Sequence, residues 1–261
     1  MQIGSSNDSA AVKAQYATSK GLDIRIAFHE KYSTNHQGYG NWIVSNYEIP
    51  QGAKVLELGC GTGSSWLGHD DVLSRCGKLV MTDLSDGMLE KAQENLGERD
   101  NVAYQNADIQ DLAYADNSFD VIIANGMLYH VPDLAKALQE VRRVLKDGGV
   151  FYCSTLGENN FTDILATWFE LGGEEFHPNH NFTMQNGGEK LGEAFAEVKP
   201  LFYEDSLHVT EVEDLVEYLC SLASFKAVLN LPVQRMRDIL NEHVKDGAID
   251  LQKDYGMFAC R

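Results

Sequence analysis

The chain has 261 residues, of which 44% are hydrophobic and 23% are charged, and its formal net charge is −18. These proportions are those of a globular protein with a sizeable core, and they exclude global disorder. The negative charge is strongest over residues 158–217, with 14 acidic and two basic side chains. It argues against nucleic acid and anionic membranes as partners.

The cysteines and histidines predict no metal site and no disulfide framework. The five cysteines are scattered and form no C-x-x-C pair, which favours reduced, buried thiols. His177 and His180 are separated by a proline and have no third ligand at metal-site spacing. The N-terminal residues lack an apolar signal-peptide core, and no apolar run reaches the ~18 residues that span a membrane. The expected location is therefore the cytoplasm, without membrane association.

The predicted elements divide the chain into four regions of one domain, residues 1–261. Residues 8–49 have helical and aromatic character and predict a helical cap. Residues 54–155 alternate apolar runs with helical periodicity, which predicts parallel strands covered on both faces. These strands are expected over residues 54–58, 78–82, 102–107, 119–124 and 150–155. Ser85 and Asp133 precede two of the helices and suit N-caps.

The second half of the chain has weaker patterns. Residues 158–195 are rich in Gly, Asn and aromatic residues, and they predict a helix followed by a lid-like insert. Residues 196–261 are expected to hold the C-terminal helices and the last strands. There, Thr210 and Glu213 have the spacing of a capping box. A further helix is expected over 232–245, and the last strand over 249–260.

The chemistry is concentrated in residues 57–63 (ELGCGTG), which follow the first predicted strand. Open α/β sheets bind ligands at this edge, and glycines let the backbone approach a ligand closely. Ser64 stands where the dinucleotide fingerprint G-x-G-x-x-G has its third glycine. Glu57 would repel a pyrophosphate but could accept hydrogen bonds from an ammonium group. The expected ligand is a nucleoside with a cationic, phosphate-free tail.

The next two strand ends supply the groups that a nucleoside needs. Asp83 ends the second strand, where a carboxylate can accept hydrogen bonds from both ribose hydroxyls. Asp108 and Ile109 end the third strand and suit the amino group and ring of an adenine. Leu84 and Met88 are placed to sandwich that ring between apolar surfaces.

The fourth strand ends beside the expected reactive end of the ligand. Asn125 and Gly126 come first, and Tyr129 and His130 follow at the mouth of the cleft. His130 has the pKa range of a general base, although it could instead pack beneath the ligand. Tyr32 in the cap is a candidate to cover the far end of the ligand.

Four segments together resemble class I S-adenosylmethionine-dependent methyltransferases. They are ELGCGTG, the acid of VMTD, Asn106-Ala107-Asp108, and DNSFDVIIANGMLYHVPDLAKALQEVRRVLKDGG. The YHV and RVLKDGG signatures resemble the bacterial small-molecule type. These motifs cover residues 54–155; RIAFHEKYSTN and NFTMQNGGEKL resemble, more loosely, that group's cap and lid.

This resemblance implies a Rossmann-like, doubly wound α/β fold. Its seven-stranded, mostly parallel sheet would have the order 3-2-1-4-5-7-6, with the last strand antiparallel. The implied cofactor is S-adenosyl-L-methionine, which yields S-adenosyl-L-homocysteine. Cys60 lies in the loop without implied thiol chemistry. The implied cofactor contacts are Glu57, Gly59, Gly61, Gly63, Asp83, Asp108, Ile109 and Asn125.

The expected reaction is an in-line methyl transfer to a small-molecule acceptor by a monomer or homodimer. The cap and residues 158–195 would form the acceptor pocket, with Phe161, Trp168, Phe176 and Phe182 closing over the cofactor. One alternative is a methyltransferase acting on tRNA or protein, which would need a basic surface or an appended domain. Another is a non-catalytic binding protein, or a different nucleoside-using enzyme, on the same scaffold.

Overall fold

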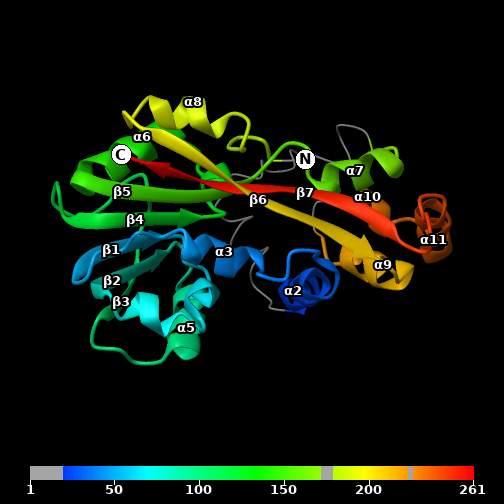
Figure 1. Ribbon diagram of the computed structural model, residues 1–261, viewed down its shortest axis with the longest axis horizontal. Coiled ribbons are helices and arrows are strands. Elements are labelled where there is room, and N and C mark those ends of the chain that lie inside the picture. Colours follow the sequence, from blue (N-terminus) through cyan, green and yellow to red (C-terminus); the bar gives the residue numbers. More distant parts are fainter. Residues whose placement is uncertain (1–19, 172–178, 223–225) are drawn as a thin grey trace.

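A computed structural model describes residues 20–171, 179–222 and 226–261, which form one seven-stranded sheet with helices on both faces (Figure 1). The strand order is β3-β2-β1-β4-β5-β7-β6. Strand β7 runs antiparallel to β5 and β6, and the other neighbouring pairs are parallel. The predicted fold class is confirmed. The strands are Ala53–Leu58 (β1), Cys76–Asp83 (β2), Val102–Asn106 (β3), Phe119–Asn125 (β4), Leu145–Leu156 (β5), Val198–Val209 (β6) and Ile249–Cys260 (β7).

Two of the helices begin at the caps that the sequence predicts. Ser85 Oγ accepts a hydrogen bond from the Met88 amide at 3.4 Å, and Asp133 Oδ1 accepts one from the Lys136 amide at 3.0 Å. The helices are α2 (Lys20–Tyr32), α3 (Tyr39–Ser45), α4 (Asp70–Leu73), α5 (Asp86–Leu96), α6 (Leu134–Val144), α7 (Phe161–Trp168), α8 (Gly187–Gly192), α9 (Val212–Cys220), α10 (Lys226–Leu229) and α11 (Val233–Asn241), with 3-10 turns η1 (Ser64–Trp66) and η2 (Leu128–His130).

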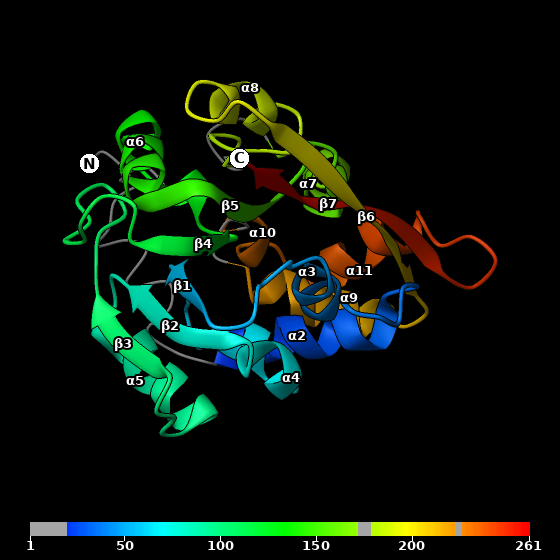
Figure 2. The ribbon, with the colours of Figure 1, turned by 60° about the vertical axis from the view of Figure 1, so that its left-hand side comes forward.

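The central strands are buried on both faces because their side chains are apolar at consecutive positions. Successive side chains of a strand point to opposite faces, so Val55 and Leu56 of β1 belong to two different hydrophobic clusters. Leu56 packs in the cluster that holds α6 and α8, and Val55 packs in the cluster that holds α3, α4 and α5. Figure 2 separates these two layers of helices.

The last two strands extend well past the rest of the sheet. Strand β7 pairs with β5 only from Tyr255 to Cys260, whereas it pairs with β6 along its whole length. Residues 204–209 and 249–254 therefore form a two-stranded arm, which lies among α2, α7, α9 and α11 (Figure 1). A third hydrophobic cluster, around Leu207, Leu251 and Leu219, holds these helices to the arm.

Strand β6 lies inside the region expected to hold the last strands, although no bounds were predicted for it. Two local predictions need correction. Strand β5 begins at Leu145, which pairs with Phe119, so it starts before the expected residue 150. The capping box does not form: α9 begins after Glu211, whose side chain caps no backbone amide in the described structure. Glu213 instead pairs with Arg237 of α11.

Candidate functional site

A main cavity of about 510 Å³ lies at the carboxyl ends of β1, β2, β3 and β4. These ends lie side by side because the four strands are parallel neighbours in the sheet. Twelve of the residues predicted from the sequence line this one cavity. They are Glu57, Gly59, Cys60, Gly61, Asp83, Leu84, Met88, Asp108, Ile109, Asn125, Gly126 and His130.

The glycine loop turns tightly over the end of β1. Gly59 and Gly61 have φ values of 66° and 54°, which glycine adopts without strain. A Cβ on Gly59 would lie 2.9 Å from Met127 Cγ, so a side chain there would displace Met127. The Gly61 amide donates a 3.0 Å hydrogen bond to Asp83 Oδ2. The loop and the end of β2 thus form one unit.

The carboxylate of Asp83 is fixed by backbone amides on both of its oxygens. Oδ2 accepts from Gly61, and Oδ1 accepts from the Ser85 amide at 2.9 Å. A carboxylate has about four acceptor sites, so Asp83 keeps the capacity to accept two further hydrogen bonds from a ligand.

Glu57 is 2% exposed at the inner wall of the cavity. Trp66 Nε1 donates a 2.6 Å hydrogen bond to its Oε2, and Ser65 Oγ lies 3.5 Å from Oε1. Burial raises the pKa of the Glu57 carboxyl to about 7, and the hydrogen bonds from Trp66 and Ser65 limit the rise. A bound cation would stabilise the ionised form.

Asn125 presents a second polar group to the cavity. Its Nδ2 donates a 2.6 Å hydrogen bond to the hydroxyl of Tyr47, which follows α3. Its Oδ1 is buried and has no hydrogen-bond partner among the described residues. An unpaired buried acceptor is costly, so the Asn125 carboxamide has hydrogen-bonding capacity that the described residues leave unused.

The opposite end of the cavity combines one carboxylate with apolar side chains. Asp108 Oδ1 accepts a 2.9 Å hydrogen bond from the Gln110 amide. Ile109 is buried, whereas Leu84 is 40% exposed at the start of α5. This end is chemically suited to a flat ring with an amino group at its edge.

Three predicted residues do not line the main cavity. Gly63 faces the packing between β2 and α5, because a Cβ there would lie 3.1 Å from Met81 Cε and 3.3 Å from Ala92 Cβ. Tyr32 is buried against the C-terminal helices, and its hydroxyl donates to Asp214 Oδ2 at 2.7 Å. Tyr129 packs against a core cluster, with its ring centroid 4.5 Å from that of His130.

The aromatic residues expected in the lid are placed differently from the prediction. Phe161 and Phe182 are each 1% exposed, in two separate core clusters, so they cannot close over the main cavity. Trp168 stacks on His243 at 3.8 Å. Phe176 lies outside the described residues.

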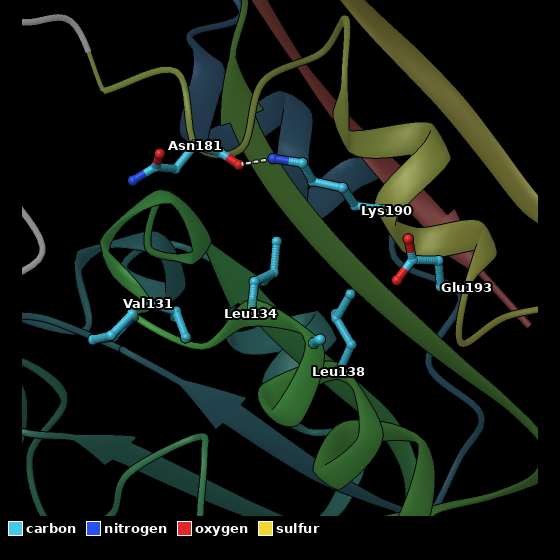
Figure 3. A pocket seen from close by; sticks show the side chains of 8 residues that line it. Val131, Leu134, Leu138, Asn181, Lys190 and Glu193 are labelled. Atoms are coloured by element: carbon cyan, nitrogen blue, oxygen red, sulfur yellow. Dashed lines mark hydrogen bonds between the residues drawn. The ribbon is translucent and has the colours of Figure 1, made fainter.

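The described part of residues 158–195 instead contributes to a smaller cavity of about 350 Å³ between α6 and α8 (Figure 3). Asn181, Lys190 and Glu193 lie on one side, and the Lys190 amine donates to the Asn181 carbonyl oxygen. Val131 and Pro132 line both cavities. The two cavities therefore adjoin at the end of η2.

Of the two histidines weighed as metal ligands, His177 lies outside the described residues. His180 Nε2 lies 3.5 Å from Asp163 Oδ1. Within the described ranges, no three His, Cys, Asp or Glu side chains are grouped closely enough to hold a metal ion. Four cysteines are buried as expected, but Cys220 is exposed. No described helix has the length and apolar character needed to cross a membrane.

Several residues that line the cavity or support it were missed by sequence reasoning. Trp66 and Tyr47 support the polar groups of Glu57 and Asn125, but no periodicity or spacing marks either of them. Gln110 and Met127 line the cavity from loops after β3 and β4. Their closeness to the strand ends was the one available signal.

The fold and the position of the main cavity together place the protein in the Rossmann-like α/β class. A glycine loop follows β1, an acid ends β2, and both line a cavity at the carboxyl edge of a 3-2-1-4-5-7-6 sheet. Residues 56–153 match the family described as methyltransferase domain. As the motifs predicted, this match, the methyltransferase relatives and the sheet order support a class I S-adenosylmethionine-dependent methyltransferase.

Among its relatives, the demethylmenaquinone methyltransferase of Staphylococcus aureus is 32% identical over 139 residues, which are 52% of this chain and 58% of the relative. The match thus spans little more than half of that relative's length.

Among solved structures, the YcgJ protein of Bacillus subtilis has a TM-score of 0.56 at 19% identity, over 84% of this chain and 96% of that chain. The [4+2]-cyclase SpnF has a TM-score of 0.59 at 16% identity, over 99% and 97%. At these identities the two structures establish a shared fold.

Proposed function

We propose that the chain is a methyltransferase that moves a methyl group from S-adenosyl-L-methionine to a small-molecule acceptor by in-line displacement. The observation that carries the proposal is the buried carboxyl of Glu57 on the cavity wall, beside the glycine loop and Asp83. A carboxylate there attracts a cationic tail and repels a pyrophosphate. The site therefore favours a nucleoside that bears a sulfonium and an ammonium group over a dinucleotide.

The cavity residues fit the parts of this cofactor. Asp83 suits the ribose hydroxyls because its acceptor capacity is not filled by the two backbone amides. Asp108 and Ile109 suit the adenine. Glu57 suits the ammonium group, and Asn125 lines the cavity from the neighbouring strand β4.

When bound, S-adenosylmethionine supplies a methyl group already activated by the sulfonium. The residues of this chain then have to align the acceptor and exclude water, which can lower a barrier by roughly 7–11 kcal/mol. His130 lines the cavity and is the residue we propose to take a proton from a hydroxyl acceptor. Tyr129, which packs on His130, would orient the imidazole ring.

A small molecule is the acceptor class that the sequence and the relatives favour. The relative from Staphylococcus aureus is named for a small acceptor, demethylmenaquinone. The net charge of −18 disfavours nucleic acid and anionic membranes. We therefore propose a cytoplasmic monomer or homodimer whose acceptor binds between the cap and residues 158–195.

Two measurements test the proposal. Saturating S-adenosylhomocysteine should raise the thermal stability, because a ligand at 100 times its Kd adds about 2.7 kcal/mol; NADH should not. With methyl-labelled cofactor and a metabolite extract, a labelled small product should form. Stabilisation by NADH alone would overturn the proposal. Stabilisation by S-adenosylhomocysteine with no labelled product from any extract would leave a binding protein rather than an enzyme.

A further inference from the structure

Gln110 lies beside Asp108 at the end of the main cavity that suits a flat ring with an amino group. Both residues line the cavity from the loop after β3, and both are partly exposed. The side-chain Nε2 of Gln110 donates to both oxygens of the Asp108 carboxylate, at 3.1 Å from Oδ1 and 3.3 Å from Oδ2. The Gln110 backbone amide donates to Oδ1 alone, at 2.9 Å. The side chain of Gln110 thus adds a contact that spans the whole carboxylate.

The orientation of the Gln110 carboxamide is determined by its two neighbours. The backbone amide of Asp133, the N-cap residue of α6, donates a 3.0 Å hydrogen bond to Gln110 Oε1. A backbone N–H can only donate, and an ionised carboxylate can only accept. One orientation satisfies both contacts, with Oε1 towards Asp133 and Nε2 towards Asp108. A flipped carboxamide would set two donors against each other at one end and two acceptors at the other.

The loop that carries Gln110 and Asp108 is attached to α6 at two points. Gln110 contacts the first residue before α6, where Asp133 caps the helix by accepting from the Lys136 amide. The Leu112 amide donates a 2.9 Å hydrogen bond to Glu140 Oε2 in the middle of the same helix. Because α6 packs on the sheet in a core cluster, Gln110 connects the Asp108 carboxylate to a fixed part of the fold.

The Asp108 carboxylate keeps acceptor capacity for a ligand. A carboxylate has about four acceptor sites. Within the described ranges, Oδ1 receives two N–H donors from Gln110, and Oδ2 receives the longer contact from Nε2. The direction in which Oδ2 can accept depends on how the carboxylate is rotated about its Cβ–Cγ bond. A single hydrogen bond to Oδ1 leaves that rotation open, whereas a donor in contact with both oxygens restricts it.

We propose that Gln110 is a positioning residue, which holds the Asp108 carboxylate so that Oδ2 accepts from the amino group of the adenine. This inference rests on the proposed function, in which Asp108 and Ile109 hold the adenine. Gln110 acts through Asp108, so it affects recognition of the 6-amino group and not the affinity for purine nucleosides in general. It thereby contributes to the preference of the site for a 6-amino purine.

The test compares two ligands that differ only at position 6 of the purine. S-adenosylhomocysteine carries the amino group, and its purine analogue carries hydrogen there. The wild type should bind the analogue roughly 10- to 150-fold more weakly, the range for a hydrogen bond to a charged group. Gln110→Met keeps the length of the side chain without its donor. By calorimetry it should weaken S-adenosylhomocysteine about 3- to 10-fold, the range for one neutral hydrogen bond. It should leave the analogue within about 2-fold, less than one such bond, which also reports that the variant is folded.

Two further variants separate the action of Gln110 on Asp108 from other effects. Gln105→Met is the matched control, because Gln105 lies on β3, accepts a 2.7 Å hydrogen bond from the Tyr114 hydroxyl and does not line the main cavity. It should bind both ligands as the wild type does. In an Asp108→Ala background the preference for the amino group should be largely lost, and Gln110→Met should then change the ratio of the two affinities no further.

Three results would overturn the inference while leaving the cofactor assignment intact. Equal weakening of both ligands by Gln110→Met would indicate a general effect on the cavity. Tighter binding of S-adenosylhomocysteine by Gln110→Met would show that Nε2 competes with the ligand for the carboxylate. An undiminished effect of Gln110→Met in the Asp108→Ala background would show that Gln110 does not act through Asp108. Wild-type protein that binds neither ligand would overturn the proposed function, and this inference with it.

Discussion

The indole Nε1 of Trp66 donates a 2.6 Å hydrogen bond to Oε2 of Glu57, which is 2% exposed beneath the glycine loop. A buried carboxyl beside an indole donor is held in place whether or not it is ionised. Because burial raises its pKa to about 7, its charge at physiological pH depends on whether a cation is bound.

Binding of S-adenosylhomocysteine should strengthen as the pH rises from 5 to 7 and level off above. Below its pKa of about 7, Glu57 must lose a proton to pair with the ammonium group, which costs up to about tenfold in affinity per pH unit. Calorimetry between pH 5 and 8.5 measures this slope. Glu57→Gln should bind more weakly and with no such slope. A wild-type profile that is flat across this range would show that Glu57 does not face the cation.

In the unliganded protein, the Glu57 carboxyl should make the stability towards unfolding fall as the pH rises, whereas it makes ligand binding stronger. The folded chain binds the Glu57 proton more tightly than the unfolded chain does, so its contribution to stability falls as the pH rises from 4.5 towards 7. Ligand-binding and unfolding measurements should therefore shift in opposite senses with pH.

Asp83→Ala should abolish most of the stabilisation by S-adenosylhomocysteine. It removes the proposed ribose acceptor and the support of the Gly61 amide, and losing hydrogen bonds to a charged group costs ~1.5–3 kcal/mol, or roughly 10- to 150-fold in affinity. Asp86→Ala is the matched control, since Asp86 accepts from Asn106 outside the cavity lining. Calorimetry measures the affinity of each variant for S-adenosylhomocysteine. Equal affinities for the two variants would show that a residue other than Asp83 contacts the ribose.

His29 should make the protein less stable in mild acid. Burial, and then Lys253, lower the pKa of its imidazole to about 3. The unfolded chain binds this proton below pH 6.5, whereas the folded chain does not until about pH 3. Stability is therefore lost as the pH falls through 6.5.

Urea unfolding at pH 7.5 and pH 5 measures this effect. His29→Gln should lose less stability on acidification than the wild type. His208→Gln, which alters an exposed histidine paired with Asp250, should behave as the wild type does. If His29→Gln kept the full wild-type loss, the acid sensitivity would have another source.

The buried ion pair of Lys253 and Asp205 should show strong coupling. Their side chains are 3% and 0% exposed, with Nζ 2.5 Å from Oδ2. Asp205→Asn leaves a buried charge without its partner and should cost about 3–5 kcal/mol of unfolding free energy. Adding Lys253→Met should restore part of that loss, as chemical denaturation would measure. Lys31→Met at the exposed Lys31–Asp214 pair should cost no more than about 1 kcal/mol. A double variant as unstable as the sum of both single changes would contradict the coupling.

The sequence predicted the sheet core well because its strands carry uninterrupted apolar runs. Residues 119–124 are buried at nearly every position. A nearly continuous apolar run of this kind is typical of a parallel strand that is covered on both faces. The helix starts after Ser85 and Asp133 were predictable because capping is a local interaction. Strand β6 had no such signal, since exposed and charged residues such as Lys199 and Glu204 interrupt it.

The cavity residues were predictable where they end a strand, and not where they support another residue. Glu57, Asp83 and Asn125 all end strands or precede the loop, so topology alone brings them together. Tyr47 meets Asn125 across 78 positions of sequence, and only the packing of α3 against the sheet brings the two together. Tyr32 was misplaced for the same reason, since α2 packs on α9 rather than over the cavity.

The arm of β6 and β7 has a consequence for how the protein unfolds. Each strand begins or ends inside the central sheet and continues without a break into the cluster of C-terminal helices. Among the described residues, β6 and β7 stay paired through this junction, so separating the helices from the sheet would break a continuous ladder of backbone hydrogen bonds. Truncation at the end of β5 would leave the parallel strands with an exposed edge at Phe151–Leu156 and an apolar flank. The two halves should therefore melt in a single cooperative step.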